Sequence, residues 1–327
     1  MKSIGGLVLA LGLLVLGSAA AGAAETVNVG YLHTLAVDGQ FWIAMEKGYF
    51  KEEGLEMKPI VFTSGVPLMQ ALSGGSVDVA IMGAVISNFP SQGVGKVFLL
   101  NDIEFDTAKL YARPESGVST IKDLKGKRIA TVKGTTAHVF LHNALKANGL
   151  DSTKDVELVS MDMAGAVAAF ISGAVPAIST WVPFDVQIRE KVPGVKLISS
   201  AKEFYPGAAI MGGWVAANKY HETKQEVLKK IIRAWAKAND YLMAGTADAL
   251  KLIHAKAYSN IPFSDIEAAW QAQKWETSKD WVKLYRDGTA AKWIGQVTQV
   301  FVEIGSIGKW VDPKEFFDTS LYLSVIK

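Results

Sequence analysis

The fold is decided by residues 47–55, which read Lys-Gly-Tyr-Phe-Lys-Glu-Glu-Gly-Leu. An apolar run before them predicts a strand over Val27–Tyr31. Gly48 is suited to end the helix in between, because glycine readily adopts the left-handed conformation found at helix ends. Residues 68–80 then read Leu-Met-Gln-Ala-Leu-Ser-Gly-Gly-Ser-Val-Asp-Val-Ala, which leads from a helical pattern into another apolar run. The N-terminal part therefore alternates strands with helices.

Apolar runs of strand length recur through the first two thirds of the chain. Helical patterns separate most of them, which is typical of βαβ units and parallel sheets. The predicted strands are Val27–Tyr31, Met57–Phe62, Val77–Met82, Val97–Leu100, Lys109–Ala112, Arg128–Val132, Glu157–Ser160, Ala177–Thr180, Lys196–Ile198 and Ala209–Ala216. From about residue 220 the pattern is almost wholly helical. We therefore expect an α/β protein whose later helices pack around a finished sheet.

Some helix starts are predicted from capping patterns. Asp38 is a candidate cap for the first helix, because a short acidic side chain accepts hydrogen bonds from free N–H groups. Thr223 with Glu226 has the spacing of a capping box, and Ser264 with Glu267 repeats it.

Composition excludes several classes of protein. The 327 residues carry 34 Lys and Arg against 32 Asp and Glu, and no basic block of five or more residues occurs. This balance argues against a nucleic-acid partner. The chain has no cysteine, which excludes disulfide scaffolds, thiolate metal sites and cysteine nucleophiles. We expect no cofactor and no metal, and the length is sufficient for two lobes.

Residues 1–24 have the pattern of a secretory signal peptide. Lys2 is a short basic region, residues 7–16 are an apolar stretch, and small residues follow. We expect cleavage near Ala23 or Ala24 and a periplasmic mature protein.

The segments at 47–55 and 68–80 resemble the first lobe of periplasmic solute-binding proteins, in the taurine, alkanesulfonate and nitrate-binding branch that serves ABC importers. The resemblance implies a two-lobed periplasmic-binding-protein fold of type II, in which each lobe is a mostly parallel sheet with helices on both faces. It further implies a first lobe of 25–107 plus 212–327, a second lobe of 108–211, and a ligand in the cleft. The implied partners are a small-molecule anion and a membrane permease, and the implied state is a monomer.

In open α/β sheets, ligands bind beyond the carboxyl ends of strands, where helix starts expose N–H groups that favour anions. In the turns of the first lobe, a hydroxyl or a glycine at a helix start is therefore a candidate contact. The candidates are His33, Ser64, Gly65, Ala84 and Val85, with Gln40 and Phe41 in the first helix and Met211 in the returning strand.

Two turns of the second lobe are candidates as well. The first resembles a threonine-rich turn of taurine-binding relatives, and the second resembles a Trp-x-Pro segment whose tryptophan lines their cleft. The candidates are Thr135, Thr136, Ala137 and His138 in the first turn, and Trp181, Phe184 and Asp185 in the second. An aspartate beside an anion is unfavourable unless it orients another side chain or meets a cationic part of the ligand.

The ligand class stays open among several alternatives. A sulfonate is the first expectation, followed by an aromatic or aliphatic carboxylate, nitrate or a pyrimidine. Taurine-binding relatives carry an acidic residue about where Gly212 stands, which would hold the ligand ammonium, and the glycine puts taurine itself in doubt. The glycine favours a ligand without an amino group, or one with more bulk near Gly212 and Gly213. None of the candidate turns, at residues 31–34, 63–65, 83–87, 134–138 and 181–185, contains an arginine, so anion binding would rest mainly on neutral N–H and O–H donors.

Two functions of other classes compete with transport. One is an enzyme of the pyrimidine-synthase-like branch, and the other is a sensory module on the same fold. The chain lacks the G-x-S-x-G, G-x-x-x-x-G-K-[ST] and G-x-G-x-x-G motifs. His138 and His142 have a spacing compatible with a metal, but no glutamate lies between them to complete a zinc-protease motif. We therefore expect a binding protein rather than an enzyme.

Overall fold

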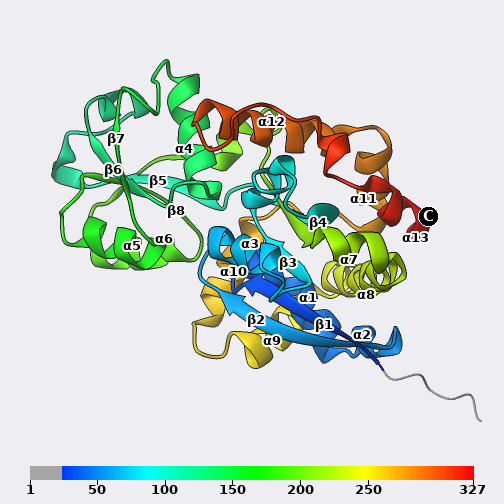
Figure 1. Cartoon of the computed structure of the whole chain (residues 1–327). Coiled ribbons are helices and arrows are strands. Elements are labelled where there is room, and N and C mark those ends of the chain that lie inside the picture. The colour runs from blue at the N-terminus through cyan, green and yellow to red at the C-terminus, as the bar shows by residue number, and fades with distance from the viewer. Residues whose placement is uncertain (1–23) are drawn as a thin grey trace, which may run out of the picture.

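The computed structural model describes residues 24–327, which form two lobes (Figure 1). The predicted signal peptide lies, but for Ala24, outside the described residues, so its cleavage stays a prediction. Within residues 24–327, no helix is both long enough and apolar enough to span a bilayer.

The first sheet has the strand order β2-β1-β3-β10-β4. Its strands are β1 (Glu25–Leu32), β2 (Leu55–Phe62), β3 (Val79–Met82), β4 (Lys96–Ile103) and β10 (Met211–Ala216). β1 pairs in parallel with β2 and β3, whereas β10 pairs antiparallel with β3 and β4. Four strands therefore run in one direction and β10 alone is reversed.

The second sheet has the strand order β7-β6-β8-β5-β9. Its strands are β5 (Ala108–Ala112), β6 (Arg128–Thr131), β7 (Glu157–Ser160), β8 (Ala177–Trp181) and β9 (Lys196–Ser200). β6 pairs in parallel with β7 and β8, and β5 pairs antiparallel with β8 and β9. The expectation of mostly parallel sheets is confirmed, with one reversed strand in each.

The chain passes between the two sheets at two links. Residues 104–107 lead from β4 to β5, and residues 201–210 lead from β9 back to β10. The two links are paired, because the Glu104 N–H donates to the Ile210 carbonyl at 2.8 Å. The two links therefore run side by side between the lobes.

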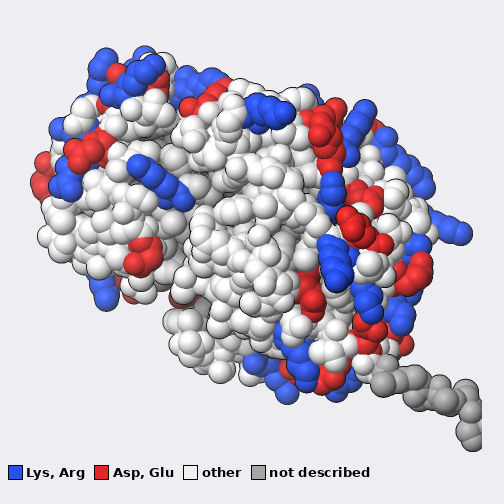
Figure 2. Space-filling view, in the orientation of Figure 1, with Lys and Arg blue, Asp and Glu red and all other residues white. Residues whose placement is uncertain are grey.

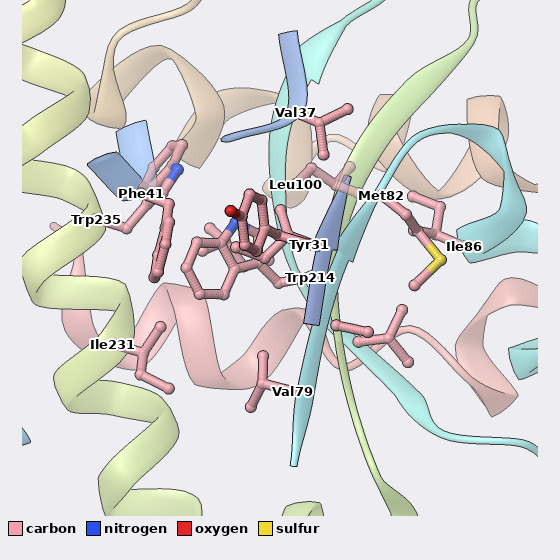
Figure 3. Close-up of a cluster of buried hydrophobic side chains, with 14 of the residues drawn as sticks. Tyr31, Val37, Phe41, Val79, Met82, Ile86, Leu100, Trp214, Ile231 and Trp235 are labelled. Atoms are coloured by element: carbon pink, nitrogen blue, oxygen red, sulfur yellow. The ribbon is translucent and has the colours of Figure 1, made fainter. Parts of the chain in front are cut away.

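The helices around the first sheet close a large apolar core. They are α1 (Leu35–Glu46), α2 (Tyr49–Glu52), α3 (Gly65–Ser73), α7 (Asn218–Thr223), α8 (Gln225–Ala244), α9 (Thr246–Ala257), α10 (Phe263–Gln271), α11 (Ser278–Arg286) and α13 (Thr319–Val325). Figure 3 shows Trp214 and Tyr31 from the sheet facing Phe41 of α1 and Trp235 of α8. Each of these side chains is at least 92% buried, so burial of their apolar surface stabilises the lobe.

The second sheet carries fewer helices. They are α4 (Thr136–Ala147), α5 (Met163–Ile171) and α6 (Phe184–Lys191). Short 3₁₀ turns complete the chain, namely η1 (Ala84–Ser87), η2 (Pro90–Gln92), η3 (Pro114–Ser116), η4 (Ile121–Leu124), η5 (Ala201–Phe204) and η6 (Pro313–Glu315).

One helix, α12 (Thr289–Glu303), packs against both lobes. Its Trp293 belongs to the first apolar cluster, whereas its Phe301 packs with Phe140 of α4 in the second. Glu303 also accepts hydrogen bonds from His142 at 2.8 Å and from Lys146 at 2.7 Å. The expected boundaries place this helix wholly in the first lobe, but its C-terminal half contributes to the core of the second.

The glycine predicted to end the first helix is confirmed, because Gly48 follows α1 in the left-handed conformation, with φ of 77°. The three predicted N-terminal caps were wrong. Thr34 precedes α1, so Asp38 lies inside the helix rather than at its start. The Thr223 hydroxyl donates to the Lys219 carbonyl at the end of α7, so it does not cap α8. Ser264 likewise lies inside α10, which begins at Phe263.

Candidate ligand-binding site

A cavity of about 550 Å³ lies between the two lobes, with walls drawn from both. It sits at the carboxyl ends of the parallel strands, where this class of sheet holds ligands. Of the predicted contacts, the structure brings to its walls His33, Ser64, Gly65, Ala84, Val85, Thr135, Thr136, Trp181 and Phe184. Their role as ligand contacts stays a prediction.

Three predicted contacts of the first lobe lie away from the cavity walls. The Gln40 amide is buried and donates to the Asn101 carbonyl at 2.9 Å and to the Asn239 side chain at 3.2 Å. Phe41 points into the apolar core, as Figure 3 shows, and Met211 is buried in the same cluster. These side chains support the lobe, and we no longer interpret them as ligand contacts.

Three predicted contacts of the second lobe are also absent from the walls. Ala137 is fully buried in the apolar core. His138 accepts the Gly134 N–H at 3.1 Å, and burial together with the nearby His142 and Lys133 lowers the pKa of His138 to about 4. His138 is therefore neutral at neutral pH, and its Nδ1 already accepts a hydrogen bond within the protein.

Asp185 also interacts within the protein instead of lining the cavity. It is 1% exposed and accepts hydrogen bonds from Lys109 and from the Tyr111 hydroxyl, both at 3.2 Å. Asp185 therefore links α6 to β5. An aspartate is tolerated at this turn because it binds Lys109 and Tyr111.

Several helices begin at the cavity without a side-chain cap. Thr34, Ser64 and Thr135 precede α1, α3 and α4, and none of these three side chains accepts a hydrogen bond from its helix. By contrast, Asp162 caps α5 by accepting the Gly165 N–H at 2.9 Å. The first N–H groups of the uncapped helices favour a negatively charged ligand group.

The threonine hydroxyls of this site are already used as donors. Thr135 donates its hydroxyl to the Val132 carbonyl at 2.7 Å, and Thr136 donates to the Glu104 carboxylate at 2.9 Å. A hydroxyl has one proton to donate. An anion at this turn would therefore meet backbone N–H groups rather than the predicted hydroxyl donors.

His33 is held between two acceptors. Its Nδ1 faces the Asp38 carboxylate at 2.9 Å, and its Nε2 faces the Ala257 carbonyl at 3.0 Å. Burial opposes the charged form, but the hydrogen bond and charge of Asp38 outweigh it and raise the pKa of His33. The ring also stacks on Tyr258 with centroids 4.1 Å apart. Both ring nitrogens of His33 therefore face acceptors of the protein, and neither has a free N–H for a ligand.

Glu104 is a wall residue that sequence reasoning missed. Its carboxylate accepts the Thr136 hydroxyl at 2.9 Å and the Thr107 hydroxyl at 3.1 Å. Burial raises the pKa of Glu104 to about 7 against the opposing effect of these bonds. The predicted strand stopped at Leu100, whereas β4 continues to Ile103, so Glu104 directly follows a strand end. A correct strand boundary would have placed it among the candidates.

The rest of the wall is mostly apolar. Val37, Phe62, Met163, Trp181 and Phe184 face the cavity, and the Trp181 and Phe184 rings meet edge to face. No Lys or Arg occurs among the described residues that line it. In the view of Figure 2, charged side chains lie mostly toward the outer margins of the two lobes. The described residues contain no group of three or more metal-ligating side chains.

Two linked sheets with a solute-sized cavity between them define a two-lobed periplasmic-binding-protein fold. The chain belongs to the NMT1/THI5-like family, whose sequence pattern matches residues 39–249. The predicted family resemblance is thereby confirmed.

Named relatives support this placement. The chain is 30% identical over 311 residues to a protein of Brucella abortus (strain 2308) named as a binding protein, covering 95% of this chain and 96% of the relative. It is 28% identical over 213 residues to the taurine-binding periplasmic protein of Escherichia coli (strain K12), covering 64% and 65%. The solved periplasmic aliphatic sulphonate binding protein SsuA from Escherichia coli has a TM-score of 0.72 at 19% identity, covering 89% and 91%. That structure shows a shared fold.

Proposed function

We propose that the chain is the periplasmic solute-binding component of an ABC importer, which captures a small organic anion and delivers it to a membrane permease. Family membership and relatives named as binding proteins support this proposal. The observation that carries it is a single cavity whose walls come from both lobes and include uncapped helix starts. No chemical step on the solute is part of the proposal.

The anionic group is proposed to lie at the helix starts. Backbone N–H groups there are fixed in place, and the positive end of each helix dipole adds to their attraction. A sulfonate or carboxylate oxygen accepts such bonds without an arginine. Sulfonate remains our first choice, and a carboxylate, nitrate or a pyrimidine are alternatives that the experiment below separates.

The body of the solute is proposed to lie against the apolar wall. Trp181, Phe184 and Met163 offer aromatic and thioether surface, which gains free energy when it covers apolar atoms. The volume of about 550 Å³ exceeds what an inorganic anion fills. This favours an organic solute over nitrate.

Capture is proposed to proceed by closure of the lobes. Ser64 and Val85 come from the first lobe, and Thr135 and Trp181 from the second. A solute that touches both lobes stabilises the closed form by its higher affinity for that form. The closed form would then dock on the permease.

Thermal shift followed by calorimetry of residues 25–327 tests the proposal. The panel holds alkanesulfonates, aromatic sulfonates, aromatic and aliphatic carboxylates, nitrate and pyrimidines. A ligand at 100 times its dissociation constant adds about 2.7 kcal/mol to stability, which is readily detected. We expect organic sulfonates or carboxylates to bind, and binding of nitrate or pyrimidines alone would contradict the proposed class.

Two variants place the binding at the cavity. Trp181→Ala should weaken it, whereas Trp310→Ala, which removes a tryptophan that is 48% exposed and lies outside the cavity wall, should leave it unchanged. Equal affinities for the two variants would contradict the location. Absence of binding to every member, with no co-purified solute found by mass spectrometry, would contradict the function.

A further inference from the structure

The Glu104 carboxylate lies where the two lobes and the link between them meet. Its three donors are the hydroxyl of Thr136 in the second lobe, the hydroxyl of Thr107 in the link, and the backbone N–H of Ala84 in the first lobe. The side chain is 7% exposed and lines the cavity. It is therefore a buried acid at the edge of the space that the solute occupies.

Within the described part of the chain, residues 24–327, this acid has no positively charged partner. Among residues 24–327, every donor that Glu104 meets is a hydroxyl or a backbone N–H, and no Lys or Arg lines the cavity. Asp102 lies two residues earlier and is fully buried, and burial, followed by the charge of Glu104, raises its pKa well above the usual range. Buried charges in proteins are normally paired, so the missing positive partner must be explained.

We propose that Glu104 determines specificity by pairing with a positively charged nitrogen of the solute, so that the solute is a zwitterion with an anionic head and an ammonium group. The inference rests on the proposed function, because the anionic head is assigned to the uncapped helix starts. The chemical class is an amino-sulfonate or amino-carboxylate with an apolar body. The ammonium supplies a positive partner for Glu104.

The glycine at 212 is consistent with this assignment. Gly212 pairs with Asp102 across β10 and β4, and a Cβ at Gly212 would lie 2.2 Å from Asp102 Oδ1. An acidic side chain at 212 would therefore collide with one that β4 already supplies. The absence of an acid at 212 does not argue against an ammonium-bearing solute, because β4 and its link carry the acids of this region.

Calorimetry with a matched pair of solutes tests the proposal. The probes are 3-aminopropanesulfonate and propane-1-sulfonate, which share the anionic head and differ by the ammonium. We expect the native protein to prefer the amine by about 10-fold or more, since the couplings measured for close charge pairs in complexes begin near this value. Glu104→Gln should reduce the preference to within about threefold while leaving the affinity for propane-1-sulfonate equal or higher.

The control variant is Glu157→Gln, which alters an exposed glutamate of β7 and should keep the full preference. Equal affinity of the native protein for the two probes, or an unchanged preference in Glu104→Gln, would overturn the inference. Binding of both probes with equal affinity would leave the proposed function standing. Failure of the whole solute panel to bind would instead overturn that function and the inference with it.

A measurement on the native protein covers the case in which Glu104→Gln does not fold. The preference for the amine should grow as the pH rises through about 7, because Glu104 ionises there. Of the other groups nearby, His33 and Asp162 line the same cavity, Asp102 lies beside Glu104, and His138 is neutral. The two ring nitrogens of His33 face the Asp38 carboxylate and the Ala257 carbonyl rather than the cavity. A ratio independent of pH between 5.5 and 8.5 would overturn the inference.

Discussion

Asp38 and Glu104 are both buried acids beside the same cavity, but their surroundings differ. Asp38 accepts hydrogen bonds from the His33 ring, from Trp42 at 2.9 Å and from the Tyr258 hydroxyl. Glu104 meets hydroxyls and a backbone N–H, and no cation. An acid whose charge is matched within the protein maintains the architecture, whereas one without a partner remains available to a solute. The predictions below test this difference.

The largest effect is expected from Asp38→Asn. The change removes the negative partner of His33 and weakens the bonds to Trp42 and Tyr258 in a fully buried place. Breaking such a pair costs about 3–5 kcal/mol. Urea unfolding should show a much lower midpoint, and the exposed Asp248→Asn should barely change it. A midpoint within error of the native one would show that the Asp38 network contributes little.

Glu104→Gln should increase the free energy of unfolding at high pH, whereas Asp38→Asn should lower it. The pKa of Glu104 is raised from 4.5 to about 7, so its contribution to stability is present below pH 4.5 and is lost as the pH rises through 7. The variant does not ionise, so without solute it should be more stable than the native protein at pH 8, by up to about 3 kcal/mol. Thermal melts from pH 4.5 to 8 measure this, and a constant difference across that range would refute the assignment.

Trp181→Ala tests the apolar wall of the cavity that Glu104 also lines. We expect the affinity for an organic solute to fall by about 1–3 kcal/mol, because aromatic surface at the wall is lost. Calorimetry with the best solute of the panel measures the loss. Unchanged affinity would remove Trp181 from the site.

The smallest effect is expected from Thr135→Val. Its hydroxyl proton is already donated to the Val132 carbonyl, so the solute loses no donor. The affinity for an anionic solute should change by less than about 1 kcal/mol, since only a local hydrogen bond is removed. If the affinity for an anionic solute fell more than tenfold while that for a neutral isostere did not change, the Thr135 hydroxyl would be a donor to the anion, as the sequence predicts.

Much of the fold could be predicted because its strands are apolar runs. The Val-Ala-Ile-Met segment of β3 is buried at every residue, and hydropathy alone indicates it. Capping patterns failed where tertiary structure decided the helix start. Thr223 closes α7 through the Lys219 carbonyl, so its spacing to Glu226 has no effect on α8.

The site was predictable after strands that hydropathy delimits correctly, and not after β4, which contains polar residues just before its end. β4 continues through Asn101 and Asp102, which hydropathy excludes from a buried strand. Asn101 is buried because its amide donates to the Val37 carbonyl at 2.9 Å, a partner 64 positions away in the chain. Local sequence does not indicate so distant a partner, so the predicted strand ended at Leu100. Glu104 therefore did not follow a predicted strand end and was not a candidate.

The most direct measurement is carboxyl ¹³C NMR of the protein labelled at its glutamate side chains, with the Glu104 signal assigned from Glu104→Gln. The account predicts that Glu104 titrates with a pKa of about 7 in the free protein, and that saturating 3-aminopropanesulfonate lowers this pKa while propane-1-sulfonate does not. A Glu104 that titrates near 4.5 without solute, or whose pKa responds equally to the two compounds, would contradict the claim that it is an unpaired acid awaiting a cationic group.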